Sequence, residues 1–439
     1  MTSYGKVVSE QRAFFKAGGT RALEKRIEAL HHLRKLVADH VDEFADAYAK
    51  DLGRGKVTAN MEAQKADARI EHALKHIEEW AKTQELPTVA PLDYYDGDRL
   101  VLVKEPLGVV LNIAPWNGPV TSIASNMFPL AAGNTVIFKP SELAPACAEL
   151  IAKLAPQYFD PKLFTVITGG IEETTALLKE RFDHIFYTGS TVVGKIIMTA
   201  AAKYLTPITL ELGGKNPVFI DETADIKNAV SRLLFAKSTS AAQICICPDY
   251  VLVETNVKDE FVVELKKQIA ALPDLSTVET YGKIVHDRAY ERLAALLANT
   301  KGSVIGRSAG ETSAKTRFFP VTAVQVKEDD VLMEDEIFGP ILVVCEAKDM
   351  NDALRIINDK EKPLAAYLFT NNHENVQKFV DETSSGGVTI NDVFLHSATP
   401  EAPFGGVGNS GMGRILGKFG FDNFTHEKPV AVRQAEFLQ

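Results

Sequence analysis

The chain has 439 residues, of which 46% are hydrophobic, and this length predicts two or three domains rather than one. The formal net charge of −10 argues against nucleic acid as the main partner, because phosphate groups bind to basic surfaces. We expect a cytoplasmic protein without a membrane anchor, since no apolar run approaches about 18 residues, no secretory signal opens the chain, and four cysteines in this length form no disulfide framework.

Amphipathic helices are predicted in the N-terminal part of the chain. Apolar residues recur at every third or fourth position in Leu23–Phe44, and a similar pattern follows in Met61–Lys82. Between residues 86 and 105, the turn signal Asp96-Gly97 separates two strand-like runs and predicts a β-hairpin. Neither of the two predicted helices carries a chemical motif, so we expect both to serve packing alone.

Short apolar runs then alternate with helical stretches. This alternation predicts a parallel sheet with right-handed crossovers, and a second alternation from Pro217 to Ile390 predicts another α/β domain. The runs of the first alternation are Val109–Ile113, Thr135–Phe138, Leu163–Ile167, His184–Tyr187 and Ile208–Leu210.

Glu211, Cys245 and Asn117 are candidate catalytic residues. Glu211 ends a predicted strand, at the edge where open α/β sheets place ligands, although a solvated glutamate is an equally good interpretation. Cys245 has small neighbours that leave a thiol open to attack, against the alternatives of a buried structural cysteine and of Cys247 as nucleophile. Asn117 offers an amide to an oxyanion, or is a turn residue before Gly-Pro. No Cys/His cluster surrounds the cysteines, so no metal site is predicted.

Two strand-to-helix segments are candidate cofactor sites. FKPSE at Phe138–Glu142 offers a cation and a carboxylate suited to a ribose or a phosphate. In YTGSTVVG at Tyr187–Gly194, the amides of a helix N-terminus suit a pyrophosphate. Ordinary turn chemistry is the alternative for both, because G-x-G-x-x-G is absent from the second.

Together these segments resemble the motifs of the aldehyde dehydrogenase superfamily, in family order over nearly the whole chain. The spacing between Glu211 and Cys245 is also that of the family. CPDY after Cys245, NDVFLH at 391–396 and GKFGFDNFTH at 417–426 resemble the class 3 branch, which includes enzymes for aromatic and fatty aldehydes. The matching motifs are PWN at 115–117, FKPSE at 138–142, TGSTxxG at 188–194, LELGGKNP at 210–217, QxC at 243–245, EIFGP at 336–340 and PFGGVGNSGMG at 403–413.

The resemblance implies NAD(P)-dependent oxidation of an aldehyde to its carboxylic acid. Cys245 would form a thiohemiacetal and then a thioester, Asn117 and the Cys245 amide would hold the oxyanion, and Glu211 would activate the hydrolytic water. NAD would be the cofactor, with NADP accepted. Lys139 and Glu142 would bind the adenosine ribose. The other implied cofactor residues are Trp116, Ser141, Gly189, Ser190, Thr191, Val192, Val193, Gly194, Leu212, Glu336 and Phe338.

The resemblance also implies the domain organisation and the assembly. Two Rossmann-like doubly wound domains are expected, an NAD(P)-binding domain of residues 1–85 and 106–210 and a catalytic domain of residues 211–414. Residues 86–105 and 415–439 would form a small β arm that pairs in a homodimer, the alternative being a hairpin folded on its own domain.

Four positions depart from the family pattern. Ala242 replaces a glycine, which is unfavourable if the backbone there needs a positive φ. Ser240 replaces an asparagine, Gly118 replaces a tyrosine at the expected substrate entrance, and Cys247 stands where alanine is usual. Ala242 and Ser240 leave open a weakened family member that acts as a binding protein. A semialdehyde dehydrogenase also stays open, because the motifs do not specify the lining of the substrate pocket. Glu211 argues against a third, a CoA-acylating enzyme.

Overall fold

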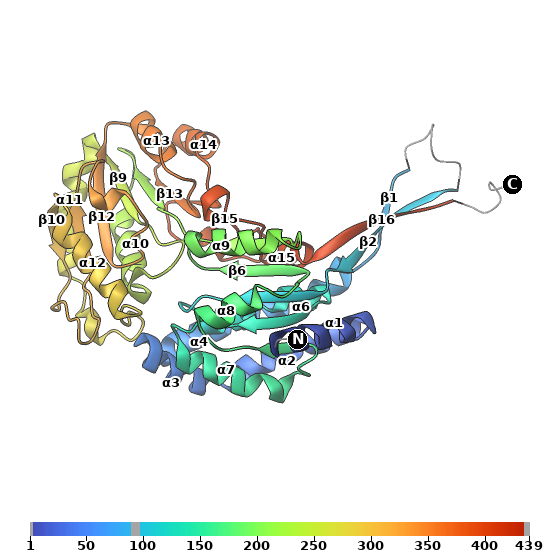
Figure 1. Cartoon of the computed structure of the whole chain (residues 1–439). Helices are drawn as coiled ribbons and strands as arrows, with labels where there is room; N and C mark the ends of the chain where they lie inside the picture. The colour runs from blue at the N-terminus through green and yellow to red at the C-terminus, as the bar shows by residue number, and fades with distance from the viewer. Residues whose placement is uncertain (1–2, 89–96, 434–439) are drawn as a thin grey trace.

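The computed structural model describes residues 3–88 and 97–433, which form two α/β bodies and a projecting arm (Figure 1). The first body contains a six-stranded sheet, the second a seven-stranded sheet, and the arm a three-stranded sheet. The predicted class, two Rossmann-like doubly wound units with a small β arm, is confirmed.

The first sheet consists of buried strands that are parallel except at one edge. Its strands are β3 (Val109–Ile113), β4 (Thr135–Lys139), β5 (Phe164–Val166), β6 (His184–Thr188), β7 (Ile208–Glu211) and β15 (Gly411–Met412). The order is β15-β7-β6-β3-β4-β5, with β15 antiparallel to β7. Burial on both faces explains why these strands are continuous apolar runs in the sequence. The order also brings together the carboxyl ends of β7, β6, β3 and β4, each of which leads into a predicted site segment.

Helices cover both faces of the first sheet. On one face, Val110 and Phe138 belong to a core shared with α2 (Leu23–Asp39), α3 (Val41–Leu52), α4 (Lys56–Trp80), α5 (Pro119–Ala124), α6 (Met127–Ala132), α7 (Pro145–Tyr158) and α15 (Gly417–Asn423). On the other, Val109 and Leu111 pack with α1 (Ser3–Lys16), α8 (Ile171–Leu177) and α9 (Thr191–Ala202).

The predicted helix over Leu23–Phe44 is wrong in one respect, because it is broken at His40. That residue ends α2 and precedes α3, with a non-helical φ of −123° and ψ of 20°. Its ring bonds to Glu43 at 2.5 Å and to the Tyr158 hydroxyl at 2.9 Å. Asp42 and Glu43 then lie in the first turn of α3, where negative charge stabilises a helix start.

The second sheet has the order β10-β11-β12-β9-β8-β13-β14, and β10 alone is antiparallel to its neighbour. Its strands are β8 (Pro217–Ile220), β9 (Tyr250–Glu254), β10 (Ser303–Arg307), β11 (Thr322–Gln325), β12 (Ile341–Ala347), β13 (Ala365–Phe369) and β14 (Gly387–Ile390). The accompanying helices are α10 (Ile226–Ser238), α11 (Lys258–Ala270), α12 (Asp287–Asn299), α13 (Met350–Asn358) and α14 (His373–Glu382). Single 3₁₀ turns lie at Ser240–Ala242, Thr255–Val257, Leu275–Thr277, Val331–Met333, Leu395–Ser397 and Gly408–Ser410.

The arm extends away from both bodies (Figure 1). It consists of β1 (Gln84–Leu86), β2 (Arg99–Pro106) and β16 (Thr425–Val432), in that order and antiparallel. Asp96 of the predicted turn lies outside the described residues. The predicted domain bounds stay predictions, although residues 411–412 pair with the first sheet and α15 packs on α4 and α6.

Candidate active site

The loop that carries Cys245 follows α10 through an unusual backbone path. Ser240, Ala241 and Ala242 have φ values of 53°, 48° and 57°, in the left-handed region that favours glycine. Each costs on the order of 1 kcal/mol and persists only if neighbouring contacts hold it. The concern raised by Ala242 in the sequence is therefore confirmed, since this position does need a positive φ.

Cys245 is half-buried, and its thiol is the centre of the site. Burial raises the pKa of Cys245 to about 12, although the backbone N–H groups of Cys245 and Ile246 oppose this by lowering it. The negative charges of Glu336 and Glu211 raise it further, so both carboxyl groups act on the thiol. The thiol is protonated at neutral pH in this arrangement and needs a proton acceptor to become a nucleophile.

Cys247, the rival nucleophile, faces the core instead. Its side chain is 5% exposed, and its thiol donates to the Ala236 carbonyl at 3.8 Å. Burial raises the pKa of Cys247 to about 11. These surroundings are those of a structural cysteine, which favours Cys245 as the reactive thiol.

Asn117 lies beside the cysteine loop, at the carboxyl end of β3. Its side-chain Nδ2 donates to the carbonyl of Gln243 at 3.0 Å, across 126 positions of sequence. An amide nitrogen carries two hydrogens, so one remains for an oxyanion that forms near Cys245. The predicted pairing of Asn117 with the cysteine loop agrees with this contact.

Glu211 is the last residue of β7 and is 2% exposed. Both carboxylate oxygens are buried without a hydrogen-bond partner among the residues that the structure describes, and burial raises the pKa of Glu211 well above its usual range. Buried polar groups are normally paired, and an orphaned carboxyl with a raised pKa is typical of an acid–base residue.

Glu336 and Phe338 join the second body to this site. Glu336 lies against Gly213, where a Cβ atom would collide with the Glu336 carboxylate, so a larger residue would displace it. Burial raises the pKa of Glu336 to about 8. Phe338, with a φ of 47°, contacts Trp116 edge to face at a centroid distance of 5.9 Å.

Contacts that hold the cysteine loop were not identified from the sequence. Asn216 Nδ2 donates to the carbonyls of Cys245 at 2.8 Å and Cys247 at 2.9 Å. The buried Lys215 bonds to Asp249 at 2.7 Å, and Asp249 accepts the Ile337 amide at 2.8 Å, which ties the Glu336 segment to the loop. The sequence did contain a signal for these residues, because Lys215 and Asn216 belong to the motif LELGGKNP and Asp249 belongs to CPDY.

The predicted ribose-binding pair lies at the carboxyl end of β4. Lys139 is almost fully buried, with its Nζ 3.6 Å from the carboxylate of the half-exposed Glu142. Lys139 also donates to the Pro140 carbonyl at 2.9 Å, and burial lowers the pKa of Lys139. The hydroxyl of Ser141 accepts the Leu143 amide at 3.2 Å and so stabilises its own turn.

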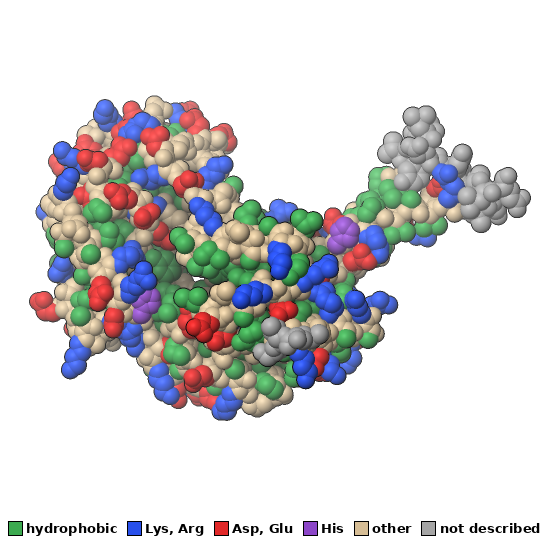
Figure 2. All heavy atoms as spheres, in the orientation of Figure 1, with side chains coloured by type: hydrophobic (Ala, Val, Ile, Leu, Met, Phe, Trp, Pro, Cys, Tyr) green, Lys and Arg blue, Asp and Glu red, His purple; other side chains and the backbone are tan. Residues whose placement is uncertain are grey.

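The predicted pyrophosphate turn starts α9. Ser190 caps this helix by accepting the Val193 amide at 3.4 Å, and a Cβ at Gly189 would collide with Tyr187. Gly194 leaves room for Leu212, and Thr191 donates to the Asn409 carbonyl at 3.2 Å. Hydrophobic side chains gather along the exposed side of α9 (Figure 2). They include Val192, Val193, Ile196 and Met198.

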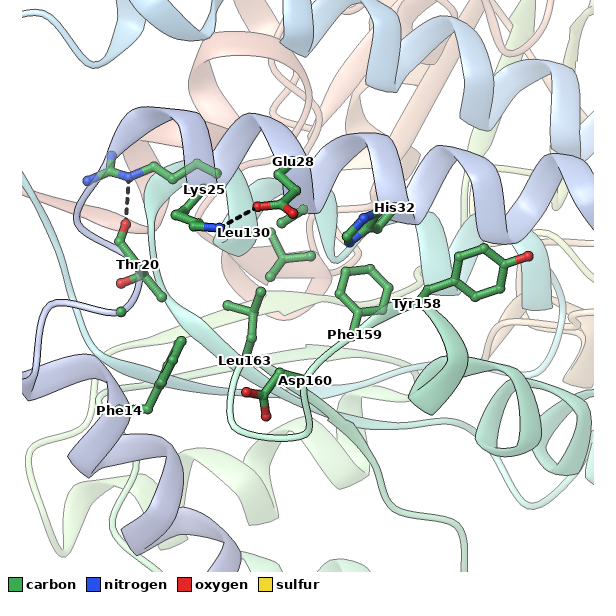
Figure 3. A pocket seen from close by; sticks show the side chains of 13 residues that line it. Phe14, Thr20, Lys25, Glu28, His32, Leu130, Tyr158, Phe159, Asp160 and Leu163 are labelled. Carbon is green, nitrogen blue, oxygen red and sulfur yellow. Dashed lines mark hydrogen bonds and ion pairs between the residues drawn. The ribbon is translucent and has the colours of Figure 1, made fainter.

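A cavity of about 430 Å³ lies elsewhere, between α1, α2 and the end of α7 (Figure 3). Phe14, Leu130, Phe159 and Leu163 form its apolar part, and no predicted site residue lines it. Within residues 3–88 and 97–433, no group of three His, Cys, Asp or Glu side chains is placed to hold a metal ion. None of the helices in these ranges is long and apolar enough to span a bilayer.

Comparison with known proteins agrees with this geometry. Residues 2–430 match the aldehyde dehydrogenase family. The chain is 40% identical over 438 residues to the dimeric NADP-preferring aldehyde dehydrogenase of Rattus norvegicus, covering 99% of this chain and 95% of the relative. It is 41% identical over 433 residues to aldehyde dehydrogenase family 3 member A2 of Macaca fascicularis, covering 97% and 87%.

A solved structure supports the same assignment. The substrate-bound state of Staphylococcus aureus AldH superposes with a TM-score of 0.94 at 38% identity, covering 99% of this chain and 95% of that one. The family 3 relatives confirm the predicted class 3 branch. The chain therefore belongs to the aldehyde dehydrogenase family and is an NAD(P)-dependent aldehyde dehydrogenase.

Proposed function

We propose that Cys245 attacks the aldehyde carbon while Asn117 and the Cys245 amide hold the oxyanion. The observation that carries this proposal is the bond from the Asn117 side-chain amide to the loop that carries the half-buried Cys245. The raised pKa of this thiol, to which Glu211 contributes, agrees with it. The thiol gives up its proton to solvent as it attacks, and Glu211 is the base that the motif assigns to the later hydrolytic step. The addition gives a thiohemiacetal on Cys245, which would become a thioester on loss of its C–H hydride to NAD(P)⁺, and water activated by Glu211 would then release the acid.

The residues present fit a dinucleotide cofactor. The amides at the start of α9 would hold a pyrophosphate, the Gly189 turn admits no side chain, and the exposed Val192 and Val193 would suit a flat adenine ring. When bound, NAD(P)⁺ supplies the acceptor for the hydride that leaves the substrate carbon. We propose that Lys139 and Glu142 hold the adenosine ribose and that Glu336 holds the nicotinamide ribose.

The substrate is proposed to be an aromatic or a medium- to long-chain aliphatic aldehyde. Phe235 on α10, a few residues before the cysteine loop, is 53% exposed and lies 6.4 Å from the ring of Phe394. An exposed aromatic side chain on the helix that leads into the cysteine loop favours an apolar substrate over a charged one. Gly118, which lacks the aromatic ring usual in the family, leaves more room at the entrance.

The test is the formation of reduced cofactor with benzaldehyde, hexanal and succinic semialdehyde, each with NAD and NADP. We expect turnover with the first two, and no turnover by Cys245→Ala, which should still bind the cofactor. Normal turnover by that variant would reject Cys245 as the nucleophile and indicate Cys247. A preference for succinic semialdehyde would indicate a semialdehyde dehydrogenase, and no turnover with any pair would favour a binding protein.

We further propose a cytoplasmic homodimer. Support comes from the arm, whose outer strands β1 and β16 have unpaired edges within the described chain, and from the word dimeric in the name of the rat relative. All four cysteines are free, as expected in a reducing compartment. The molar mass in solution should be twice the 48.0 kDa of one chain, and cell fractionation tests the location.

A further inference from the structure

We propose that Arg54 is a positioning residue that fixes the distance between the two halves of the oxyanion hole. This inference rests on the proposed function of Asn117 and Cys245. Arg54 lies in the short connection between α3 and α4, far from both loops in sequence, and is 4% exposed.

The guanidinium of Arg54 bridges the two loops directly. One terminal nitrogen donates to the Ser240 hydroxyl at 2.8 Å, and the other donates to the Asn117 carbonyl at 2.7 Å. Among the described residues, no carboxylate lies within ion-pair distance of Arg54, and its plane rests near the Tyr48 ring at 5.5 Å. Its two terminal nitrogens are therefore committed to the loops of the active site rather than to a charge partner.

The cysteine loop needs such support because of its backbone. Ser240 is the first of the three consecutive residues with positive φ, and Arg54 bonds to it there. Gln243 holds the other end of this turn, since its side chain donates to the Ser240 and Lys283 carbonyls at 3.1 Å. Without Arg54, the strained turn keeps the Gln243 contact to the Ser240 carbonyl but loses the bond that holds the Ser240 hydroxyl.

The Asn117 loop is held from the same helical layer. Glu62 of α4 accepts the Thr121 amide at 3.0 Å, and the Tyr48 hydroxyl of α3 accepts the Val120 amide at 3.0 Å. Tyr48 in turn donates to Glu62 at 2.6 Å. Side chains of α3 and α4 therefore anchor the segment after Asn117. Arg54, between these two helices, bonds both to Asn117 and to Ser240 of the cysteine loop.

Loss of this bridge should slow the step in which the oxyanion forms. Misplacing a reacting group by about 1 Å costs on the order of 100-fold in rate, and we expect this loss in hydride transfer for Arg54→Met. Arg54→Lys, which keeps a cation but only one point of contact, should lose about 10-fold. Cofactor affinity should stay within about 2-fold in both variants, because neither donor of Arg54 reaches the predicted cofactor residues.

The experiment measures single-turnover hydride transfer at saturating benzaldehyde and NAD, together with cofactor affinity and the rate at which iodoacetamide alkylates Cys245. Alkylation needs the thiolate but no oxyanion hole, so it should be unchanged in Arg54→Met while hydride transfer falls. Arg34→Met is the matched control, since Arg34 also links two N-terminal helices, through Asp67 and Glu71, away from the site. Hydride transfer in that variant should match the wild type.

Ser240→Ala is a second, independent variant that tests the same bond if Arg54→Met does not fold. We expect a loss of about 10-fold for Ser240→Ala alone and no further loss when it is added to Arg54→Met, because both remove the same bond. Wild-type hydride transfer in folded Arg54→Met, equal losses in alkylation and hydride transfer, or additive losses in the double variant would overturn the proposal. An inactive wild type or an active Cys245→Ala would instead reject the proposed function.

Discussion

Substitution of Glu211 by glutamine should separate the two half-reactions. Glutamine keeps the shape of the buried side chain but cannot take a proton from water. General-base catalysis contributes about 100- to 10,000-fold, so thioester hydrolysis should slow by that factor. Hydride transfer should change little, because the oxyanion contacts of Asn117 and the Cys245 amide do not involve Glu211.

The assay is rapid mixing of Glu211→Gln with an aldehyde and NAD. One equivalent of reduced cofactor per active site should form quickly, followed by slow turnover, and mass spectrometry should detect the acyl group on Cys245. In the wild type, hydrolysis should rise with pH, because burial raises the pKa of Glu211 and only its deprotonated form is a base. This pH dependence should be absent from Glu211→Gln. Steady turnover at the wild-type rate, or loss of the burst, would refute the role.

The same burial predicts a pH-dependent difference in stability. The folded state binds the Glu211 proton more tightly than the unfolded state, whose pKa is near the ordinary 4.5. The tighter binding of this proton therefore adds its full amount to the free energy of unfolding below that pH. This contribution is lost as pH rises towards the folded pKa. Over this window the wild type should lose up to about 1.4 kcal/mol per pH unit relative to Glu211→Gln. A difference in the free energy of urea unfolding between the wild type and Glu211→Gln that stays constant at all pH values would contradict this.

Two further predictions concern Ala242 and Glu142. Ala242→Gly should raise the free energy of unfolding by about 1 kcal/mol, since glycine adopts the φ of 57° without steric cost; an unchanged urea midpoint would reject the strain argument. Glu142→Gln should increase the NADP-to-NAD ratio of kcat/KM by about 10-fold, because the exposed carboxylate next to Lys139 repels a ribose 2′-phosphate. Glu172→Gln, on the first turn of α8, is its control, and equal ratios in the two variants would remove Glu142 from cofactor choice.

Local sequence was sufficient to predict those elements whose formation depends on burial and turn preferences within a few residues. β3 has the predicted bounds, Val109–Ile113, because a strand covered on both faces must be a continuous apolar run. The site segments also share an edge as expected, since parallel strands align their carboxyl ends. The break at His40 was not predicted, and one of the two partners of its ring is Tyr158, 118 positions further along the chain, where local periodicity gives no signal.

The sequence by itself therefore determined the two α/β units, the family motifs and the identity of the candidate thiol, base and amide. Only the tertiary structure decided which cysteine is open and which is buried, how the Ser240–Ala242 turn is held, and that Arg54 lies between Ser240 and Asn117. The physical reason is range: periodicity and turn preference act within a few residues, whereas these contacts join positions 63 to 186 residues apart. Chain folding alone brings such positions together.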